Sequence, residues 1–355
     1  MDRPDRLHRG RGATFSPDNR YSSTTREVHD DGWGNLDAPL EPLPTTLTVD
    51  SSRTVIAYND SPDVGFDRSI NPYRGCEHGC VYCFARPSHA WLGLSPGLDF
   101  ESRLFYKPDA PERLKHELAA RSYRPAPIAV GINTDAWQPV ERKLRITRRI
   151  LEVLLECRHP FSIVTKSSLI ERDLDLLQEA ARLNLVSVAV SITTLDRQLA
   201  RVMEPRAAAP QRRLDVIHNL SSAGVPVSVL VAPVIPVLTD GEMESILEVA
   251  RAAGARAAGY VLLRLPHELK QLFTAWLEAH HPNKATHVMN RLRDMRGGKE
   301  YDSRFGARMR GTGDYAGLLA KRFAMAERRL GFGEFPELDA ALFTPPRLAP
   351  QLDLF

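Results

Sequence analysis

Six short apolar segments alternate with segments of helical periodicity between residue 53 and Pro266. Such alternation is typical of a parallel β-sheet, because each helix returns the chain to the end of the sheet from which the next strand starts. The expected strands are 69–73, 128–131, 161–165, 186–191, 225–231 and 257–263. We therefore predict an α/β fold with six βα units.

Three of the four cysteines stand close together, with the spacing Cys-x3-Cys-x2-Cys at Cys76, Cys80 and Cys83. Three thiolates on one loop can ligate three corners of a cubane iron-sulfur cluster and leave the fourth iron open. A structural zinc ion needs four ligands, and neither His78 nor His89 completes a familiar zinc-finger spacing. A disulfide framework requires pairing and a secreted context. The motif favours an iron-sulfur cluster, with zinc as the alternative.

Length and composition permit one large core, since the chain has 355 residues with 43% hydrophobic content. The formal net charge of +3 does not by itself establish nucleic-acid binding. The first six residues are charged and lack the apolar core of a signal peptide. The longest apolar run, 225–238, is interrupted by three prolines and is too short to span a bilayer. We expect a cytoplasmic protein with reduced thiols and no membrane segment.

Changes in composition divide the chain into four parts. Residues 1–52 are rich in Arg, Asp, Ser, Gly and Pro and are expected to form an irregular arm. Residues 53–266 hold the six βα units, and residues 267–334 form a basic, helical extension. Residues 335–355 are punctuated by prolines and are predicted to be a flexible tail.

Polar residues follow the predicted strands, at the end where parallel βα folds place their working face. Thr134 and Asp135 follow the second strand, Lys166 the third, Ser191 the fourth, and Ala232 the fifth. A sulfonium nucleoside with an amino acid moiety needs an acceptor for its ammonium group, donors for its carboxylate and hydrogen bonds to its ribose. Asp135 or Thr134, Lys166 and Ser191 have this chemistry in that order.

The cysteine triplet, with Tyr82 directly before its third member, resembles the signature of the radical S-adenosylmethionine (SAM) enzymes. The resemblance implies a 4Fe-4S cluster on the three cysteines, SAM chelated by the open iron, and cleavage of SAM to a 5'-deoxyadenosyl radical. It also implies an open partial (β/α)6 barrel of the TIM type. An electron donor such as flavodoxin or ferredoxin would reduce the cluster.

Within these enzymes the segment 69–266 is most similar to the spore photoproduct lyase branch, which is also labelled DNA repair photolyase-like. The motifs that match are Thr134 with Asp135, 164–166 (Val-Thr-Lys), Ser191, 231–233 (Val-Ala-Pro) and Glu204 with Pro205. In that branch the backbone of the Val-Ala-Pro segment lies near the adenine of SAM, which implies this role for Ala232. The wider chain resembles an uncharacterised bacterial group that shares the Tyr-Arg-Gly-Cys-Glu-His-Gly-Cys segment.

Two departures separate this chain from the lyase itself. The lyase has a hydrogen-donor cysteine where this chain has Ile132, and a tyrosine where this chain has Phe84. Isoleucine cannot return a hydrogen atom to a carbon radical, so the same reaction would require Cys157 or Tyr82 as the donor. We therefore expect radical chemistry in DNA repair or nucleic-acid modification. The alternatives are modification of RNA, a peptide or a small metabolite, and a non-catalytic iron-sulfur adaptor.

Two features of the carboxy-terminal part bear on partners. Segment 291–329 has eleven Lys and Arg residues against five Asp and Glu. It can therefore bind a DNA backbone, or it can form salt bridges within the extension. The chain ends in Gln351, Leu352, Asp353, Leu354 and Phe355. This pentapeptide resembles the peptide that docks bacterial repair proteins on the DNA polymerase sliding clamp, and the alternative is a tail that packs on its own domain.

Overall fold

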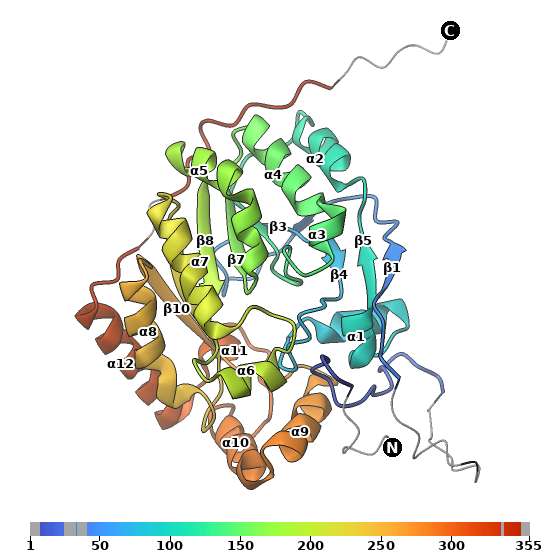
Figure 1. Cartoon of the computed structure of the whole chain (residues 1–355), viewed down its shortest axis with the longest axis vertical. Coiled ribbons are helices and arrows are strands. Elements are labelled where there is room, and N and C mark those ends of the chain that lie inside the picture. Colours follow the sequence, from blue (N-terminus) through green and yellow to red (C-terminus); the bar gives the residue numbers. More distant parts are fainter. Residues whose placement is uncertain (1–7, 25–32, 34–40, 335–336, 349–355) are drawn as a thin grey trace.

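The centre of the molecule is an open sheet of seven strands in the order β10-β9-β8-β7-β6-β3-β2 (Figure 1). The computed structural model describes residues 8–24, 33, 41–334 and 337–348. Six neighbouring strands are parallel, namely β3 (Arg68–Ile70), β6 (Ile128–Val130), β7 (Phe161–Thr165), β8 (Val186–Ser191), β9 (Val227–Val234) and β10 (Ala257–Leu262). The predicted partial (β/α)6 barrel is confirmed. An additional strand, β2 (Ile56–Tyr58), pairs antiparallel with β3 and forms one edge.

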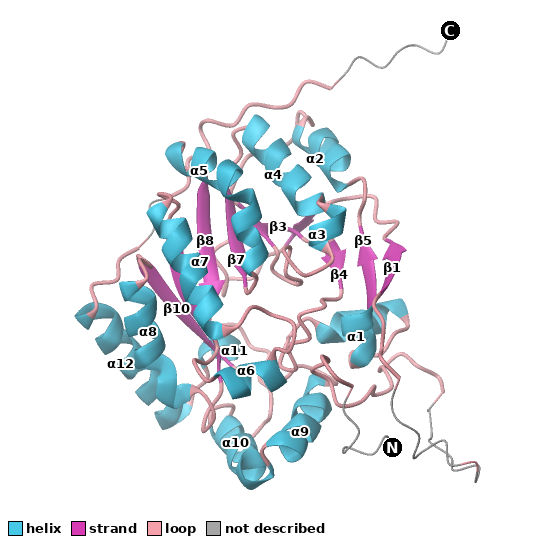
Figure 2. Ribbon diagram, in the orientation of Figure 1, coloured by secondary structure: helices cyan, strands magenta, loops and turns pink. Residues whose placement is uncertain are grey.

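Helices cover the outer face of this sheet (Figure 2). They include α2 (Ala110–Leu118), α3 (Glu141–Leu144), α4 (Ile146–Glu156), α5 (Leu174–Arg182), α7 (Pro210–Ser222) and α8 (Met243–Ala252), with short 3-10 turns η2 (Ser168–Asp173) and η3 (Asp240–Glu242). The short helix α6 (Arg197–Met203) lies beyond the carboxyl ends of the strands (Figure 2). In α4, Ile146, Ile150 and Leu154 are four residues apart and at most 1% exposed. This spacing places them on one helical face, which packs into the core.

A second, three-stranded sheet stands beside the barrel and carries the cysteine loop. It contains β1 (Thr46–Val49), β5 (Arg103–Tyr106) and β4 (Tyr73–Arg74). The strand predicted over 69–73 is thus divided into β3 and β4, because Pro72 interrupts it and proline cannot donate to a strand ladder. β1 lies in the part of the chain expected to be irregular. Its sequence, Thr-Leu-Thr-Val, alternates polar and apolar residues, but all four side chains are exposed, so neither face of the strand packs into the core.

Four helices follow β10. They are α9 (Leu269–His280), α10 (Pro282–Asp294), α11 (Ala307–Arg310) and α12 (Gly313–Arg329). α12 packs against α8, and α11 lies against β10 at the open edge of the sheet. None of the helices that the structure describes is both long and apolar enough to cross a membrane.

The described part of the tail, 337–348, crosses the barrel at the amino ends of the strands, at the top of Figure 1. Its backbone N–H groups donate to the carbonyl oxygens of Asn184 and Cys157. Phe343 packs edge-on against the imidazole of His159, with 5.3 Å between the ring centroids. Segment 335–355 was predicted to be a flexible tail. The contacts of residues 337–348 attach this part of it to the barrel at the amino ends of the strands.

Candidate active site

The cysteine loop runs from β4 to the short helix η1 (Arg86–Leu92). Cys76 and Cys80 are buried, Cys83 is half-buried, and all three thiols are free. The backbone N–H of Cys83 donates to the carbonyl of Cys80, and that of Arg86 donates to the carbonyl of Cys83. Gly79 occupies the left-handed region, with φ of +68°, where glycine is favoured. The loop is therefore a series of tight turns that keeps the thiols near one another.

A buried ion pair anchors this loop. Arg86 and Glu101 are both 0% exposed, and their side chains contact each other directly. The Arg86 guanidinium also donates to the carbonyl oxygens of Gly79, Cys80 and Gly97, at 2.9 to 3.1 Å. Because a single rigid group satisfies several loop carbonyls at once, it holds the backbone that carries the thiols.

The amino-terminal segment closes over the outside of the same loop. The backbone N–H groups of Gly12 and Ala13 donate to the Glu101 carboxylate at 2.9 and 2.8 Å. A Cβ at position 12 would lie 1.8 Å from the Gly79 carbonyl oxygen, so only glycine permits this approach. Sequence reasoning missed Arg86, Glu101 and Gly12, because no local pattern distinguishes them from surface residues.

Burial is the main electrostatic influence on the thiols. It raises the pKa of Cys76 and of Cys80, and negative charge on Asp135 and the neighbouring thiols raises the pKa of Cys76 further. A thiolate at these positions therefore needs a bound cation to stabilise it. Within the described residues, no set of three or more His, Cys, Asp or Glu side chains is arranged to hold a single metal ion.

A cavity of about 500 Å³ opens at the carboxyl ends of the strands. All three clustered cysteines line it. The other predicted site residues that line it are Tyr82, Thr134, Asp135, Lys166, Ser191 and Ala232. Ile132 lines the cavity as well. The sequence rule that polar residues gather at strand ends thus brings this set together in space.

Asp135 connects the ends of two neighbouring strands. Its carboxylate accepts hydrogen bonds from the Thr165 hydroxyl at 2.9 Å and from the Lys166 backbone N–H at 2.7 Å. It also accepts from the Trp137 N–H at 2.9 Å and lies 3.4 Å from Nδ1 of His78. These contacts occupy most of its acceptor positions, so the main task of Asp135 is to orient the β6 and β7 loops.

The hydroxyl groups at the strand ends donate to backbone carbonyls. Ser191 and Thr193 donate to the Ala232 carbonyl at 3.1 and 2.9 Å, and Thr134 donates to the Tyr73 carbonyl at 2.9 Å. A hydroxyl oxygen that donates in this way keeps its lone pairs as acceptors. Thr134 and Ser191 can therefore still accept hydrogen bonds from a ligand in the cavity.

Lys166 is the cation of the predicted set. Its Nζ lies 5.8 Å from the centre of the Tyr82 ring. The ion pairs found among the described residues do not include Lys166, so its ammonium group has free donors facing the cavity. A carboxylate bound there would receive charge-assisted hydrogen bonds, which are stronger than neutral ones.

Tyr82 belongs to a buried polar network behind the third cysteine. Its hydroxyl contacts the Glu204 carboxylate and lies 3.0 Å from the Thr193 hydroxyl. Arg213 pairs with Glu204 and also donates to the Ser191 carbonyl at 3.0 Å. Burial raises the pKa of Glu204, and the Arg213 charge opposes that rise. The network joins the cysteine loop to the end of β8, so Tyr82 has a positioning role.

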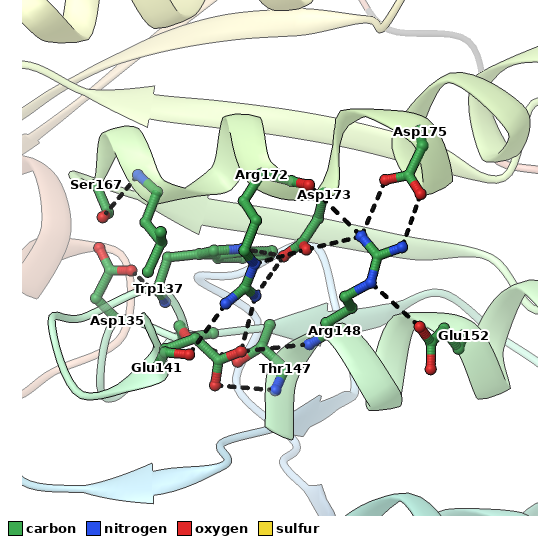
Figure 3. Close-up of polar contacts among 12 residues, drawn as sticks. Asp135, Trp137, Glu141, Thr147, Arg148, Glu152, Ser167, Arg172, Asp173 and Asp175 are labelled. Atoms are coloured by element: carbon green, nitrogen blue, oxygen red, sulfur yellow. Dashed lines mark hydrogen bonds and ion pairs between the residues drawn. The ribbon is translucent and has the colours of Figure 1, made fainter. Parts of the chain in front are cut away.

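A second network supports the loop that follows β6 (Figure 3). The indole N–H of Trp137 donates to Asp173 at 2.8 Å, and Arg148 pairs with the same carboxylate at 3.1 Å. Arg172 bridges Asp173 and Glu141 at 2.7 and 2.9 Å. Asp173 and Glu141 are both 0% exposed. This network fixes the loop from its outer side, while the cavity lies on its inner side.

Cys157 lies apart from the cavity. It follows α4, before β7 begins, and is therefore at the amino ends of the strands. Its side chain is 1% exposed, and burial raises the pKa of its thiol to about 11. Cys157 thus packs as a small apolar residue at the end of the barrel opposite the clustered cysteines.

The basic segment 291–329 uses most of its charges within the protein. Its arginines that form ion pairs are Arg291, Arg293, Arg304, Arg308, Arg322 and Arg329. Arg296 is buried and donates to the carbonyl oxygens of Ala307 and Leu263. The segment therefore offers fewer free cations for a phosphate backbone than its composition indicated.

A comparison with models of protein families matches residues 70–250 to the model described as the radical SAM superfamily. The match covers just over half of the chain. The chain belongs to the radical SAM superfamily. The matched residues include the whole cysteine loop and the strand ends from β6 to β9. Similar curated proteins include uncharacterised relatives, and similar solved structures include a lyase.

The relatives by sequence carry no assigned activity. An uncharacterised protein of Mycobacterium tuberculosis is 39% identical over 232 residues, which are 65% of this chain and 67% of that protein. An uncharacterised protein of Methanocaldococcus jannaschii is 29% identical over 173 residues, which are 49% of this chain and 62% of that protein.

Similar solved structures include several of spore photoproduct lyase. The lyase complexed with a dinucleoside spore photoproduct has a TM-score of 0.57 and 16% identity, over 81% of this chain and 80% of that one. A lyase variant with bound AdoMet and the same product has a TM-score of 0.52 and 14% identity, over 80% and 78% of the two chains. At these identities the likeness establishes the fold.

Proposed function

We propose that Cys76, Cys80 and Cys83 hold a 4Fe-4S cluster and that the adjoining cavity binds SAM. The observation that carries the proposal is the convergence of the three thiols and the free Lys166 ammonium group on one cavity of about 500 Å³. A fourth cysteine is absent from its described lining, which leaves one iron for an exogenous ligand. When bound, the cluster and SAM supply a 5'-deoxyadenosyl radical by reductive cleavage of the sulfonium.

The chain's own residues bind and orient. Lys166 donates to the carboxylate of SAM, and the hydroxyl oxygens of Thr134 and Ser191 accept from its ammonium and ribose groups. Asp135 keeps these loops in register through its bonds to Thr165 and Lys166. The buried strand residues behind them exclude water from the reacting atoms. Reduced thiols also require a reducing compartment, and we propose the cytoplasm.

The proposed substrate is nucleic acid, and the proposed reaction is repair or modification of DNA. The support is the fold shared with a lyase that was solved with a dinucleoside spore photoproduct. Ile132 lines the cavity, and its described lining has no thiol besides the three proposed ligands. We therefore propose that the reaction differs from that of the lyase in how the substrate radical is quenched.

Reduced, anaerobically reconstituted protein is expected to release 5'-deoxyadenosine, and ultraviolet-damaged DNA should stimulate the release more than undamaged DNA. The measurement is chromatographic quantification of 5'-deoxyadenosine with no DNA and with each DNA. A Cys83→Ala protein is the matched control and should lose the iron-sulfur absorbance together with the release. No release from fully loaded wild-type protein would favour the non-catalytic adaptor. Release indifferent to DNA would redirect the search to RNA, peptides or metabolites.

We propose the DNA polymerase sliding clamp as a partner, on the sequence pattern of the last five residues alone. These residues, Gln351, Leu352, Asp353, Leu354 and Phe355, lie outside the described part of the structure. In a Leu354→Ala, Phe355→Ala protein, capture on immobilised clamp should fall at least tenfold, since apolar anchors dominate peptide binding. Leu348→Ala removes an exposed leucine upstream of the pentapeptide and should leave capture unchanged. Equal capture of all three proteins would remove this partner.

A further inference from the structure

The mouth of the cavity contains one arginine with few partners. Arg264 follows β10 by two residues and lines the cavity. Its Nε is buried and, among the described residues, has no hydrogen-bond partner. Nη1 lies 3.5 Å from the sulfur of Met309, which is a weak acceptor. None of the ion pairs of the described residues includes Arg264.

Other buried arginines behave differently. Arg86 and Arg213 each pair with a buried carboxylate and also donate to backbone carbonyls. The Nε of Arg296, close to Arg264, is also buried without a partner, but its two terminal nitrogens donate to backbone carbonyls. A partly buried guanidinium without comparable acceptors is unusual, because buried polar groups are nearly always hydrogen-bonded. Arg264 therefore has unused donors directed at a site where a ligand can enter.

The charged groups around Arg264 have other partners, which leaves its guanidinium available to a ligand. The charge of Arg264 acts on the Asp63 carboxylate, whose pKa is lowered by the Gly306 backbone N–H, by Arg308 and by Arg264. The Asp63 oxygens already accept from Gly306 at 2.6 Å and pair with Arg308. On the other side, the cation Arg296 repels Arg264, and Asp302 near Arg296 is engaged by Arg304.

Two aromatic side chains line the cavity together with Arg264. The Arg264 guanidinium lies 5.0 Å from the centre of the Phe84 ring, and Phe84 directly follows Cys83. Phe84 is 40% exposed and Tyr58 is 64% exposed, and both line the cavity. Exposed aromatic faces beside a free arginine match the two needs of a single-stranded nucleic acid, stacking of bases and binding of a phosphodiester.

We infer that Arg264 binds a phosphodiester of the substrate beside the cysteine loop. This inference rests on the proposed function, because it treats the cavity as the place where substrate meets the cofactor site. The planar guanidinium presents paired N–H donors that match two oxygens of a phosphate. The guanidinium lies over the Phe84 ring, and this cation–π contact holds it beside the cysteine loop. Arg264 thus selects for substrates that carry a backbone phosphate near the reacting base.

The test is equilibrium binding of the dinucleotide thymidylyl-thymidine, which has one phosphodiester, to anaerobically reconstituted protein. Arg264→Gln should weaken binding about tenfold, the loss expected for a charge-assisted contact. Arg264→Lys keeps the positive charge but lacks the paired N–H donors of the guanidinium. Its affinity for the dinucleotide should therefore lie between those of the wild-type and Arg264→Gln proteins. The analogue with a neutral methylphosphonate linkage should bind wild-type and Arg264→Gln proteins equally.

The matched control is Arg256→Gln, because Arg256 is exposed at the amino end of the same strand, away from the cavity. It should leave dinucleotide binding unchanged. SAM affinity, measured in parallel, should be the same in Arg264→Gln as in wild type. An equal loss of SAM affinity would make Arg264 a cofactor ligand and overturn the inference.

Two further outcomes separate this inference from the proposed function. Undetectable dinucleotide binding by wild-type protein that still releases 5'-deoxyadenosine would overturn the role of Arg264 and leave the radical chemistry standing. Arg264-dependent binding in a protein that releases none would keep the binding site and remove the proposed catalysis. If Arg264→Gln lowers the melting temperature, the folded Arg264→Lys protein is compared with the wild type instead. Wild-type affinity of Arg264→Lys for both the phosphodiester and the methylphosphonate dinucleotide would contradict a role for the paired guanidinium donors.

Discussion

Replacing Arg86 with leucine is expected to lower the free energy of unfolding by about 3–5 kcal/mol, the usual loss when one partner of a buried ion pair is removed. Arg86 and Glu101 are both 0% exposed, so the substitution leaves an unpaired carboxylate inside the protein. It also removes the donors that hold the carbonyl oxygens of Gly79 and Cys80. The cysteine loop should therefore loosen, and iron content after reconstitution should fall with stability.

The measurement is urea unfolding at pH 7 together with iron and sulfide analysis of the reconstituted protein. Arg113→Leu is the matched control, because Arg113 pairs with Asp109 at the surface, where the side chains are 36% and 46% exposed. An exposed pair of this kind contributes at most about 1 kcal/mol, so the control should keep near wild-type stability and iron. Equal losses in the two variants would show that Arg86 does not anchor the loop.

The second large effect is a loss of stability in acid that arises from His159. Burial lowers the pKa of His159 from its usual 6.5 to about 4. Its Nδ1–H donates to the Pro160 carbonyl at 2.9 Å, and Nε2 accepts from the Tyr123 hydroxyl at 2.7 Å. The folded protein thus holds the neutral imidazole, while the unfolded chain takes up a proton below pH 6.5.

Because only the unfolded chain takes up this proton, stability falls as the pH is lowered. The contribution of His159 to the free energy of unfolding is complete above pH 6.5 and is lost as the pH falls from 6.5 toward 4. The loss is about 1.4 kcal/mol per pH unit, or roughly 3 kcal/mol in total. Burial likewise lowers the pKa of His89 to about 4 and also lowers the pKa of His78, His280 and His281, so several histidines reduce stability in the same direction as the pH falls. Phe343 packs on His159, and the described tail should detach as the imidazole is protonated.

Urea unfolding at several pH values between 7 and 4 measures this effect. A His159→Gln protein should show a smaller loss than the wild type, because His159 no longer contributes while the other histidines with a lowered pKa still do. His116→Gln, at an exposed position on α2, should follow the wild-type curve. A pH dependence that His159→Gln leaves unchanged would contradict the assignment.

The parallel strands, as segments of the chain, and the candidate ligands were accessible from sequence because both depend on local patterns. Each of the six parallel strands is a short apolar segment between helical periods, and each strand end is marked by polar residues such as Asp135 or Lys166. In a parallel βα fold these ends meet at one edge of the sheet. Arg264, two residues after β10, follows the same rule, although the predicted strand-end residues extended only to the fifth strand.

Predictions about single residues were less complete where the partner is distant in sequence. Asp135 has the chemistry of an ammonium acceptor, but Thr165 and Lys166, thirty residues on, occupy its oxygens. Composition likewise indicated a basic surface over 291–329, whereas arginines there pair with acidic residues on other elements, as Arg322 does with Glu244. A charge seen in sequence does not reveal whether folding will neutralise it.

The sequence by itself determined the βα architecture, the cysteine spacing and the strand-end chemistry, since hydrophobic periodicity and close spacing are properties of neighbouring residues. Only the tertiary structure placed Gly12 and Glu101 against the cysteine loop, moved Cys157 to the opposite end of the barrel, and left Arg264 with unused donors beside Phe84. The physical reason is burial. Whether a charged or polar group is paired, orphaned or exposed depends on elements that meet only when the chain folds.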